Sequence, residues 1–147
     1  MQRWACRVPA KNDQQGRPAM EPVIARGNRA EVHKGAEGVL AQVLIDPRST
    51  GAKSLALGYI SFAAGSSVPP HTREVDEFIY VIEGIATILS CGREFMLDPG
   101  DAIYIPAGTE HQHVNKAGET TLRQLYIFSP PGPEQGVMMW PRAGGEA

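Results

Sequence analysis

The sequence predicts an all-β fold, a sandwich or a closed barrel, and two observations carry that prediction. From about residue 35 onward, short β-rich runs follow one another at close intervals, separated by Gly, Pro, Asp and Asn. In addition, two glycine-bounded patterns in the middle of the chain place histidines at corresponding positions, as expected for a pocket inside a small β-barrel.

The elements follow in chain order. Residues 1–34 are rich in Gln, Asn, Lys, Arg and Pro without sustained periodicity, so we expect a polar arm there, with Met20 as a candidate start of the chain. We place the barrel in residues 35–130 and an extension in residues 131–147. The predicted strands are 38–45, 54–63, 77–83, 85–89, 93–97, 102–105, 111–115 and 122–128. No helix is required between them.

Length and composition fit one domain with a small-molecule partner. The chain has 147 residues, of which 42% are apolar, enough for one sizeable core. A net charge of −2 predicts no nucleic-acid partner. No apolar run approaches the ~20 residues that span a bilayer, so we expect a cytoplasmic protein that binds no membrane. The chain has only two cysteines, Cys6 and Cys91, so we expect no disulfide framework.

The first pattern begins at Gly65 and ends at Gly84. Between them lie His71, Arg73 and Glu77, separated by one and three residues. Even separations put side chains on one face of a strand, so we expect these three side chains to point the same way. An imidazole and a carboxylate that converge on a barrel interior are suitable ligands for a divalent ion.

The second pattern runs from Gly100 to Asn115 and brings a further imidazole. Pro106 and Gly108 predict a tight turn into a strand that carries His111. Together the two patterns supply two histidines and one glutamate, which predicts a metal pocket with positions left open for water or substrate.

In their combined spacing, the two patterns resemble the paired motifs of the cupin superfamily, and specifically its small single-domain members, over roughly residues 38–130. The resemblance implies a single double-stranded β-helix, or jelly-roll, barrel. It also implies that His71, Glu77 and His111 are metal ligands. Where the family has a second histidine in the first motif this chain has Arg73, so the sequence departs from the family at that position.

Arg73 leaves two interpretations open. A guanidinium stays protonated and cannot bind a cation, so the site loses one ligand and gains a positive charge. In the first interpretation His71, Glu77 and His111 hold one divalent metal ion. Arg73 then takes a catalytic role by gripping an anionic substrate. In the second interpretation Arg73 pairs with Glu77 or Asp76 and no metal is bound. We favour the first because the remaining ligand types stay in register.

The first interpretation predicts a metal-dependent enzyme that acts on a small organic, anionic substrate. Iron is the preferred ion, with zinc, manganese or nickel as alternatives. The resemblance covers oxygenases, isomerases, lyases and decarboxylases, and we place Fe(II) dioxygenase chemistry slightly ahead because the ligands resemble the 2-His-1-carboxylate triad. The alternative is a non-catalytic binding or sensing barrel without metal, in which Arg73 is paired to Glu77.

Other polar residues are expected to have structural roles. His113 shares a strand face with His111, and we expect it at the barrel mouth, with replacement of the ligand missing at Arg73 as the alternative. His33, in the polar arm, is expected to be solvated. Core packing is the expectation for four residues whose strands border the pocket: Tyr59, Tyr104, Tyr126 and Gln124.

Two predicted strands are apolar on both faces, at residues 78–82 and 103–105. One face fills the barrel, and the other must be covered. Cupins commonly pair through their sheets, so the resemblance implies a homodimer. The alternative is that the polar arm and residues 137–140 cover this surface within one chain.

Overall fold

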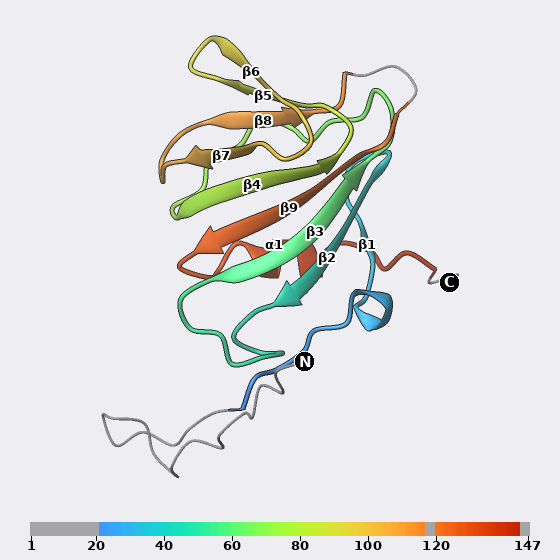
Figure 1. The fold of residues 1–147 in the computed structure, drawn as a ribbon, viewed down its shortest axis with the longest axis vertical. Helices are drawn as coiled ribbons and strands as arrows, with labels where there is room; N and C mark the ends of the chain where they lie inside the picture. Colours follow the sequence, from blue (N-terminus) through green and yellow to red (C-terminus); the bar gives the residue numbers. More distant parts are fainter. Residues whose placement is uncertain (1–20, 117–119, 145–147) are drawn as a thin grey trace, which may run out of the picture.

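Nine strands and two short helical segments make up the part of the chain that the computed structural model describes, residues 21–116 and 120–144 (Figure 1). One sheet has six strands in the order β1-β2-β3-β9-β4-β7, the other has three in the order β6-β5-β8, and neighbouring strands are antiparallel. The elements are η1 (Gly27–Arg29), β1 (His33–Lys34), β2 (Val39–Ile45), β3 (Ala56–Phe62), β4 (Asp76–Glu83), β5 (Ala86–Ser90), β6 (Arg93–Leu97), β7 (Ala102–Ile105), β8 (His111–Val114), β9 (Leu122–Ser129) and α1 (Glu134–Met138).

The predicted all-β jelly-roll fold is confirmed. The eight predicted strands correspond to β2 through β9, and their ends differ by no more than two residues, as where residues 54–63 become Ala56–Phe62. The structure adds β1 within the predicted arm and α1 within the predicted extension. Neither helical segment among the described residues has the length and apolarity that crossing a membrane requires.

Alternation of buried and half-buried residues in β3 and β9 builds the inner surface of the barrel. In the ladder between these strands, Ile60 lies opposite Gln124 and Phe62 lies opposite Leu122. All four side chains are buried. Burying an apolar side chain such as Phe62 contributes roughly 1.5–3 kcal/mol, so this face fixes the register of the two strands. Because Gln124 is two residues from Leu122 on β9, its side chain also points into the barrel.

Gly84 makes the turn that leads from β4 into the smaller sheet. Its φ is +80°, in the left-handed region, and a Cβ there would lie 2.9 Å from both the Thr121 carbonyl oxygen and the Leu122 Cα. A side chain would therefore be strained and would also collide with the start of β9. Gly84, which ends the first pattern, is thus a turn that glycine alone accommodates.

Asn115 ends the second pattern and is a structural residue. Its side chain is fully buried. The side-chain amide donates hydrogen bonds to the carbonyl oxygens of Phe62, at 3.0 Å, and Thr120, at 2.9 Å. These bonds tie the end of β8 to the end of β3 and to the segment before β9, which holds the strand of His111 in place.

The larger sheet begins inside the segment expected to be a polar arm. β1 pairs with β2, and His33 on β1 is only 4% exposed, so the expectation that His33 is solvated is wrong. Its Nδ1 donates a hydrogen bond to the carbonyl oxygen of Trp140 at 3.0 Å. The remaining part of the predicted arm, residues 1–20 with Met20, lies outside the described residues.

The outer face of β4 and β7 is apolar and open to solvent. Residues 137–140 do not cover it, because Val137 and Trp140 pack toward the core and line the pocket. For this segment the alternative of an intrachain cover is wrong. Large apolar side chains exposed on this face are Phe78, Tyr80, Ile82 and Tyr104.

Candidate metal centre

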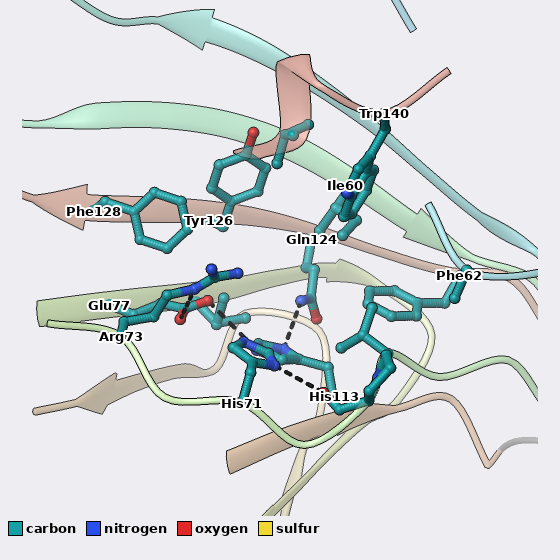
Figure 2. A pocket seen from close by; sticks show the side chains of 15 residues that line it. Ile60, Phe62, His71, Arg73, Glu77, His113, Gln124, Tyr126, Phe128 and Trp140 are labelled. Atoms are coloured by element: carbon teal, nitrogen blue, oxygen red, sulfur yellow. Dashed lines mark hydrogen bonds and ion pairs between the residues drawn. The ribbon is translucent and has the colours of Figure 1, made fainter. Parts of the chain in front are cut away.

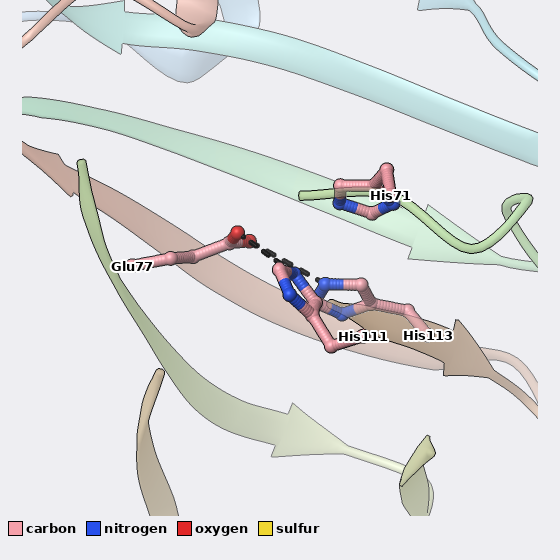
Figure 3. A group of neighbouring side chains, drawn as sticks. All are labelled: His71, Glu77, His111 and His113. Carbon is pink, nitrogen blue, oxygen red and sulfur yellow. Dashed lines mark hydrogen bonds and ion pairs between the residues drawn. The ribbon is translucent and has the colours of Figure 1, made fainter. Parts of the chain in front are cut away.

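Four side chains meet inside the barrel: His71, Glu77, His111 and His113 (Figure 3). One nitrogen or oxygen from each lies within 4.8 Å of those of the others. Glu77 lies on β4, His111 and His113 lie on β8, and His71 precedes β4. The structure therefore brings the three predicted ligands together and adds a fourth group.

His71 reaches the cluster by a route that strand parity did not predict. β4 begins at Asp76, so His71 and Arg73 are not on the strand of Glu77, and the even-spacing argument is wrong for both. Instead, His71 forms an isolated antiparallel bridge with His111, with one backbone N–H···O bond of 2.9 Å in each direction. Because a bridged pair lies side by side, backbone pairing places the two imidazoles together.

The carboxylate of Glu77 is buried between two imidazoles. Its Oε2 lies 3.1 Å from His111 Nε2, and its Oε1 lies 3.4 Å from His113 Nε2. Burial alone would raise the pKa of the Glu77 carboxyl, but hydrogen bonds from His111 and His113 outweigh burial and hold this pKa well below its usual range. Glu77 is therefore ionised and available as an anionic ligand.

The histidine pKa values diverge for physical reasons. Burial, with a smaller contribution from the Arg73 guanidinium, lowers the pKa of His71 to about 4, against an opposing backbone hydrogen bond to Pro69. Burial also lowers the pKa of His111, but the hydrogen bonds to Glu77 and to the Thr109 carbonyl outweigh it and leave that pKa raised. His71 is thus neutral near neutral pH, whereas His111 retains a proton more readily.

Backbone carbonyls orient two of the rings. His71 Nδ1 lies 2.9 Å from the Pro69 carbonyl oxygen, and His111 Nδ1 lies 2.9 Å from that of Thr109. A carbonyl only accepts, so each Nδ1 carries the hydrogen, and in the neutral ring Nε2 keeps its lone pair. The Nε2 of His71 is buried without a hydrogen-bond partner, as expected at a ligand position.

His113 lies in the cluster, and the expectation that it sits at the barrel mouth is wrong. It is 5% exposed, and its ring stacks on that of His71 at a centroid distance of 5.7 Å. The sequence signal was its even separation from His111, which predicted the shared face but not the depth. Depth follows from the pairing of β8 with β5, where His113 lies opposite the buried Ile88.

Gln124 orients His113 and is a site residue that sequence reasoning assigned only to packing. Its side-chain Nε2 lies 3.3 Å from His113 Nδ1, while its Oε1 is buried without a partner. The two ends of an amide are interchangeable in shape. With Oε1 turned to accept from Nδ1–H, Gln124 Oε1 and His113 Nδ1 are both satisfied, the amide nitrogen takes the position without a partner, and a neutral His113 ring keeps its lone pair on Nε2. The only sequence signal was its even separation from Leu122, Tyr126 and Phe128, which puts Gln124 on the same face of β9 as these apolar residues.

The donor set fits a divalent transition metal ion. Neutral imidazoles and a carboxylate are the ligand types that iron, zinc, manganese and nickel sites use. Three observations support this fit: the convergence of the donors, the unpartnered Nε2 of His71, and the carbonyls that hold two rings with Nε2 inward. His71, Glu77, His111 and His113 would hold the ion.

Arg73 lies beside the cluster without pairing tightly to it. Its Nε is 4.0 Å from Glu77 Oε2, farther than either imidazole contact of that carboxylate. The guanidinium carbon lies 5.4 Å from the centroid of the Phe128 ring, and the buried Nε has no hydrogen-bond partner. Asp76, the other proposed partner, instead accepts a hydrogen bond from the Ala107 amide at 3.0 Å. Arg73 therefore keeps hydrogen-bonding capacity for a ligand.

The cluster forms one end of a cavity of about 430 Å³, in the range that holds small organic ligands (Figure 2). Gln124 and Tyr126 line it, whereas Tyr104 is exposed on the outer face and Tyr59 faces away from the interior. Burial raises the pKa of Tyr126, and its hydroxyl donates to the Gln42 carbonyl oxygen at 3.0 Å. The apolar walls include Ile60, Phe62, Val68, Tyr126, Phe128 and Trp140.

Comparison with known proteins gives consistent results. The family model described as "Cupin domain" matches residues 58–128. The tetracenomycin polyketide synthase protein TcmJ of Streptomyces glaucescens is 34% identical over 116 residues, which cover 77% of this chain and 76% of that protein.

Solved structures agree with that result. The polyketide cyclase RemF from Streptomyces resistomycificus is 30% identical, with a TM-score of 0.64, over 78% of this chain and 82% of that one. An RmlC-like cupin from Shewanella frigidimarina has a TM-score of 0.66 over 78% of this chain and 96% of that one. At 22% identity, the latter likeness concerns the fold alone.

Proposed function

Because the chain belongs to the cupin family, we propose that it is a metal-dependent enzyme that closes rings in an enolisable small molecule of the polyketide type. The observation that carries this proposal is the arrangement of four metal-ligating side chains at one end of an apolar cavity, beside a guanidinium whose Nε has no partner. Similarity to two proteins whose names refer to polyketide synthesis or cyclisation supports the substrate class.

The chemistry suits this arrangement. A polyketide alternates carbonyl and methylene groups, so an enolate carbon can attack a distant carbonyl carbon. A carbon–carbon bond forms, the proton lost from the methylene is balanced by one gained at the carbonyl oxygen, and loss of water follows. No oxidant is consumed. A divalent ion, when bound, would supply Lewis-acid stabilisation of the enolate oxygen.

The chain's own residues would bind and orient the substrate. Arg73 offers charge-assisted hydrogen bonds to an anionic or enolic oxygen close to the cluster. The apolar walls exclude water and hold the reacting carbons near one another, which lowers the entropic part of the barrier. Glu77 and the oriented imidazoles would hold the ion, and the carboxylate would supply the negative charge of the site.

Iron-dependent dioxygenase chemistry is the second candidate. The combination of imidazoles with one carboxylate favours it, because this ligand type binds Fe(II) and leaves positions for oxygen and substrate. A binding or sensing barrel without turnover is the third, and it requires Arg73 to neutralise Glu77. The 4.0 Å separation between Arg73 Nε and Glu77 Oε2 gives that pairing weak support.

The test combines metal-loaded protein with a soluble poly-β-ketone and follows products by mass spectrometry, with and without oxygen. We expect a product that has lost water, formed equally well without oxygen, and absent with His111→Ala. Gly27→Ala is the matched control, because Gly27 does not line the cavity and no atom lies within 4 Å of its added Cβ. A product that has gained oxygen atoms with oxygen uptake would replace the cyclase proposal with the dioxygenase. Unchanged substrate under both conditions would contradict both enzymatic proposals.

A further inference from the structure

One wall of the pocket comes from a segment outside both sheets. This segment, residues 134–143, consists of α1 and the residues after it, and we call it the strap. Val137 and Trp140 of the strap line the cavity together with residues of the barrel. Figure 2 shows Trp140 across the cavity from His71 and His113. The pocket is therefore open-ended in the barrel and completed by the strap.

The strap is held along β1 by backbone hydrogen bonds. The Lys34 amide donates to the Pro141 carbonyl oxygen, and the Ala143 amide donates to that of Val32, each at 2.7 Å. The buried His33 adds a side-chain bond to the Trp140 carbonyl oxygen at 3.0 Å. These bonds join Trp140 and the residues after it to β1 and its neighbour Val32, so the body of the fold holds the backbone that carries the indole ring.

Gly35 provides the space in which the Trp140 ring lies. A Cβ on Gly35 would lie 2.5 to 2.9 Å from three atoms of the indole ring, closer than real contacts allow. The φ of Gly35 is not in the left-handed region, so its backbone would accept alanine. The requirement at Gly35 is thus for space alone, and a substitution there displaces the Trp140 ring without changing any cavity-lining residue in the sequence.

Polar atoms gather at one end of the cavity, and aromatic rings lie beside that end and along the rest of the lining. Three side chains that each have a buried polar atom without a hydrogen-bond partner gather at the cluster end: His71, Arg73 and Gln124. Aromatic rings of Phe62, Tyr126, Phe128 and Trp140 form much of the remaining lining. A ligand that matches both ends carries an anionic oxygen on a flat aromatic ring system, because ring faces stack favourably on aromatic walls.

We propose that Trp140, seated on Gly35, is a specificity-determining residue that selects flat aromatic anions over flexible aliphatic anions of the same charge. The inference rests on the proposed function for the reactive end of the ligand, at the cluster and Arg73. It adds the opposite end, where the indole meets the ring system. Stacking on one aromatic residue contributes an about fivefold preference for the flat ligand.

The test uses two probes, anthraquinone-2-carboxylate and decanoate, with the metal-loaded full chain. The sequence has two tryptophans, Trp4 and Trp140, so Trp4→Phe leaves Trp140 as the only one. In that background we expect anthraquinone-2-carboxylate to quench the fluorescence saturably. Calorimetry of Trp140→Leu should show about fivefold weaker binding of this probe and unchanged binding of decanoate.

Gly35→Ala tests the same claim from outside the cavity. It should weaken anthraquinone-2-carboxylate binding in the same direction, with metal content unchanged. Gly27→Ala is the matched control, because no atom lies within 4 Å of its added Cβ and its φ is not in the left-handed region. Three results would overturn the inference. The first is that neither probe binds, and the second is that anthraquinone-2-carboxylate binds saturably without quenching. The third is that Trp140→Leu and Gly35→Ala both leave the preference between the two probes unchanged.

The outcomes separate this inference from the proposed function. Selectivity that depends on Trp140 in a protein without metal or turnover would leave the inference standing and contradict the enzyme proposal. If metal content and ring closure are normal but selectivity does not depend on Trp140, the enzyme proposal stands and this inference is contradicted.

Discussion

At the scale of single residues, the hydrogen bonds already made within the candidate site decide which atoms remain free to bind a ligand. Glu77 is committed to two imidazoles, whereas the Nε of Arg73 has no partner. Spacing in the sequence predicted His71, Glu77 and His111 as neighbours, and the structure brings them together. It did not predict the depth of His113, because parity gives the face of a strand and not the distance from the barrel mouth.

The variant Arg73→His tests whether Arg73 binds the anionic ligand or is only a tolerated replacement of a metal-binding histidine. We expect the variant to bind metal at least as well, since it adds an imidazole next to Glu77. It should bind anthraquinone-2-carboxylate about tenfold or more weakly, because a charge-assisted hydrogen bond is lost. Calorimetry with the metal and with the probe measures both effects. Arg73→Lys, which keeps the charge without the planar fork, should lie between them. Undiminished anion binding in Arg73→His would remove Arg73 from the site.

Metal affinity should decrease as the pH falls. The pKa of His111 is raised, so a proton competes with the ion for this imidazole below that pKa, whereas His71, with a pKa of about 4, does not compete near neutral pH. Between about pH 8 and about pH 6 we expect the dissociation constant to rise, by up to about tenfold per pH unit below the His111 pKa. A chromophoric chelator in competition measures it, and a flat profile would contradict His111 as a ligand.

At the scale of elements, the strands could be predicted closely and the connections between them could not. Turn residues and alternation located β2 through β9. Neither reveals that His71 pairs with His111 as an isolated bridge, because that contact joins segments 40 residues apart in sequence. The strap was equally hidden, since Val137 and Trp140 show their role only once Gly35 lies beneath the indole ring.

Gly58 on β3 tests how tightly the inner face is packed. A Cβ there would overlap the Tyr126 ring and lie 2.5 Å from the Gln42 carbonyl oxygen, which accepts the Tyr126 hydroxyl. We expect Gly58→Ala to lower the free energy of unfolding by about 1–3 kcal/mol through overpacking. Urea denaturation measures this change. Gly27→Ala should stay within about 0.5 kcal/mol of the parent, and equal effects of the two changes would contradict the packing account.

At the scale of the whole molecule, the exposed face of β4 and β7 predicts a homodimer. Phe78 and Tyr104 stack there at 5.2 Å, and Tyr80 and Ile82 are 45% and 46% exposed. A second copy of the chain would bury this apolar surface. Sedimentation should show a dimer, and Tyr80→Glu with Ile82→Lys should give a folded monomer. A monomer in the parent protein would contradict the prediction.

The central claim is that His71, Glu77, His111 and His113 hold a divalent transition metal at the end of the apolar cavity. The most direct measurement is elemental analysis by plasma mass spectrometry of the parent protein, His111→Ala and the control His33→Ala, each purified without chelator. We expect about one ion per chain in the parent and in His33→Ala, and strong loss in a folded His111→Ala. No metal in the parent even after reconstitution, or equal metal in all three proteins, would contradict the claim.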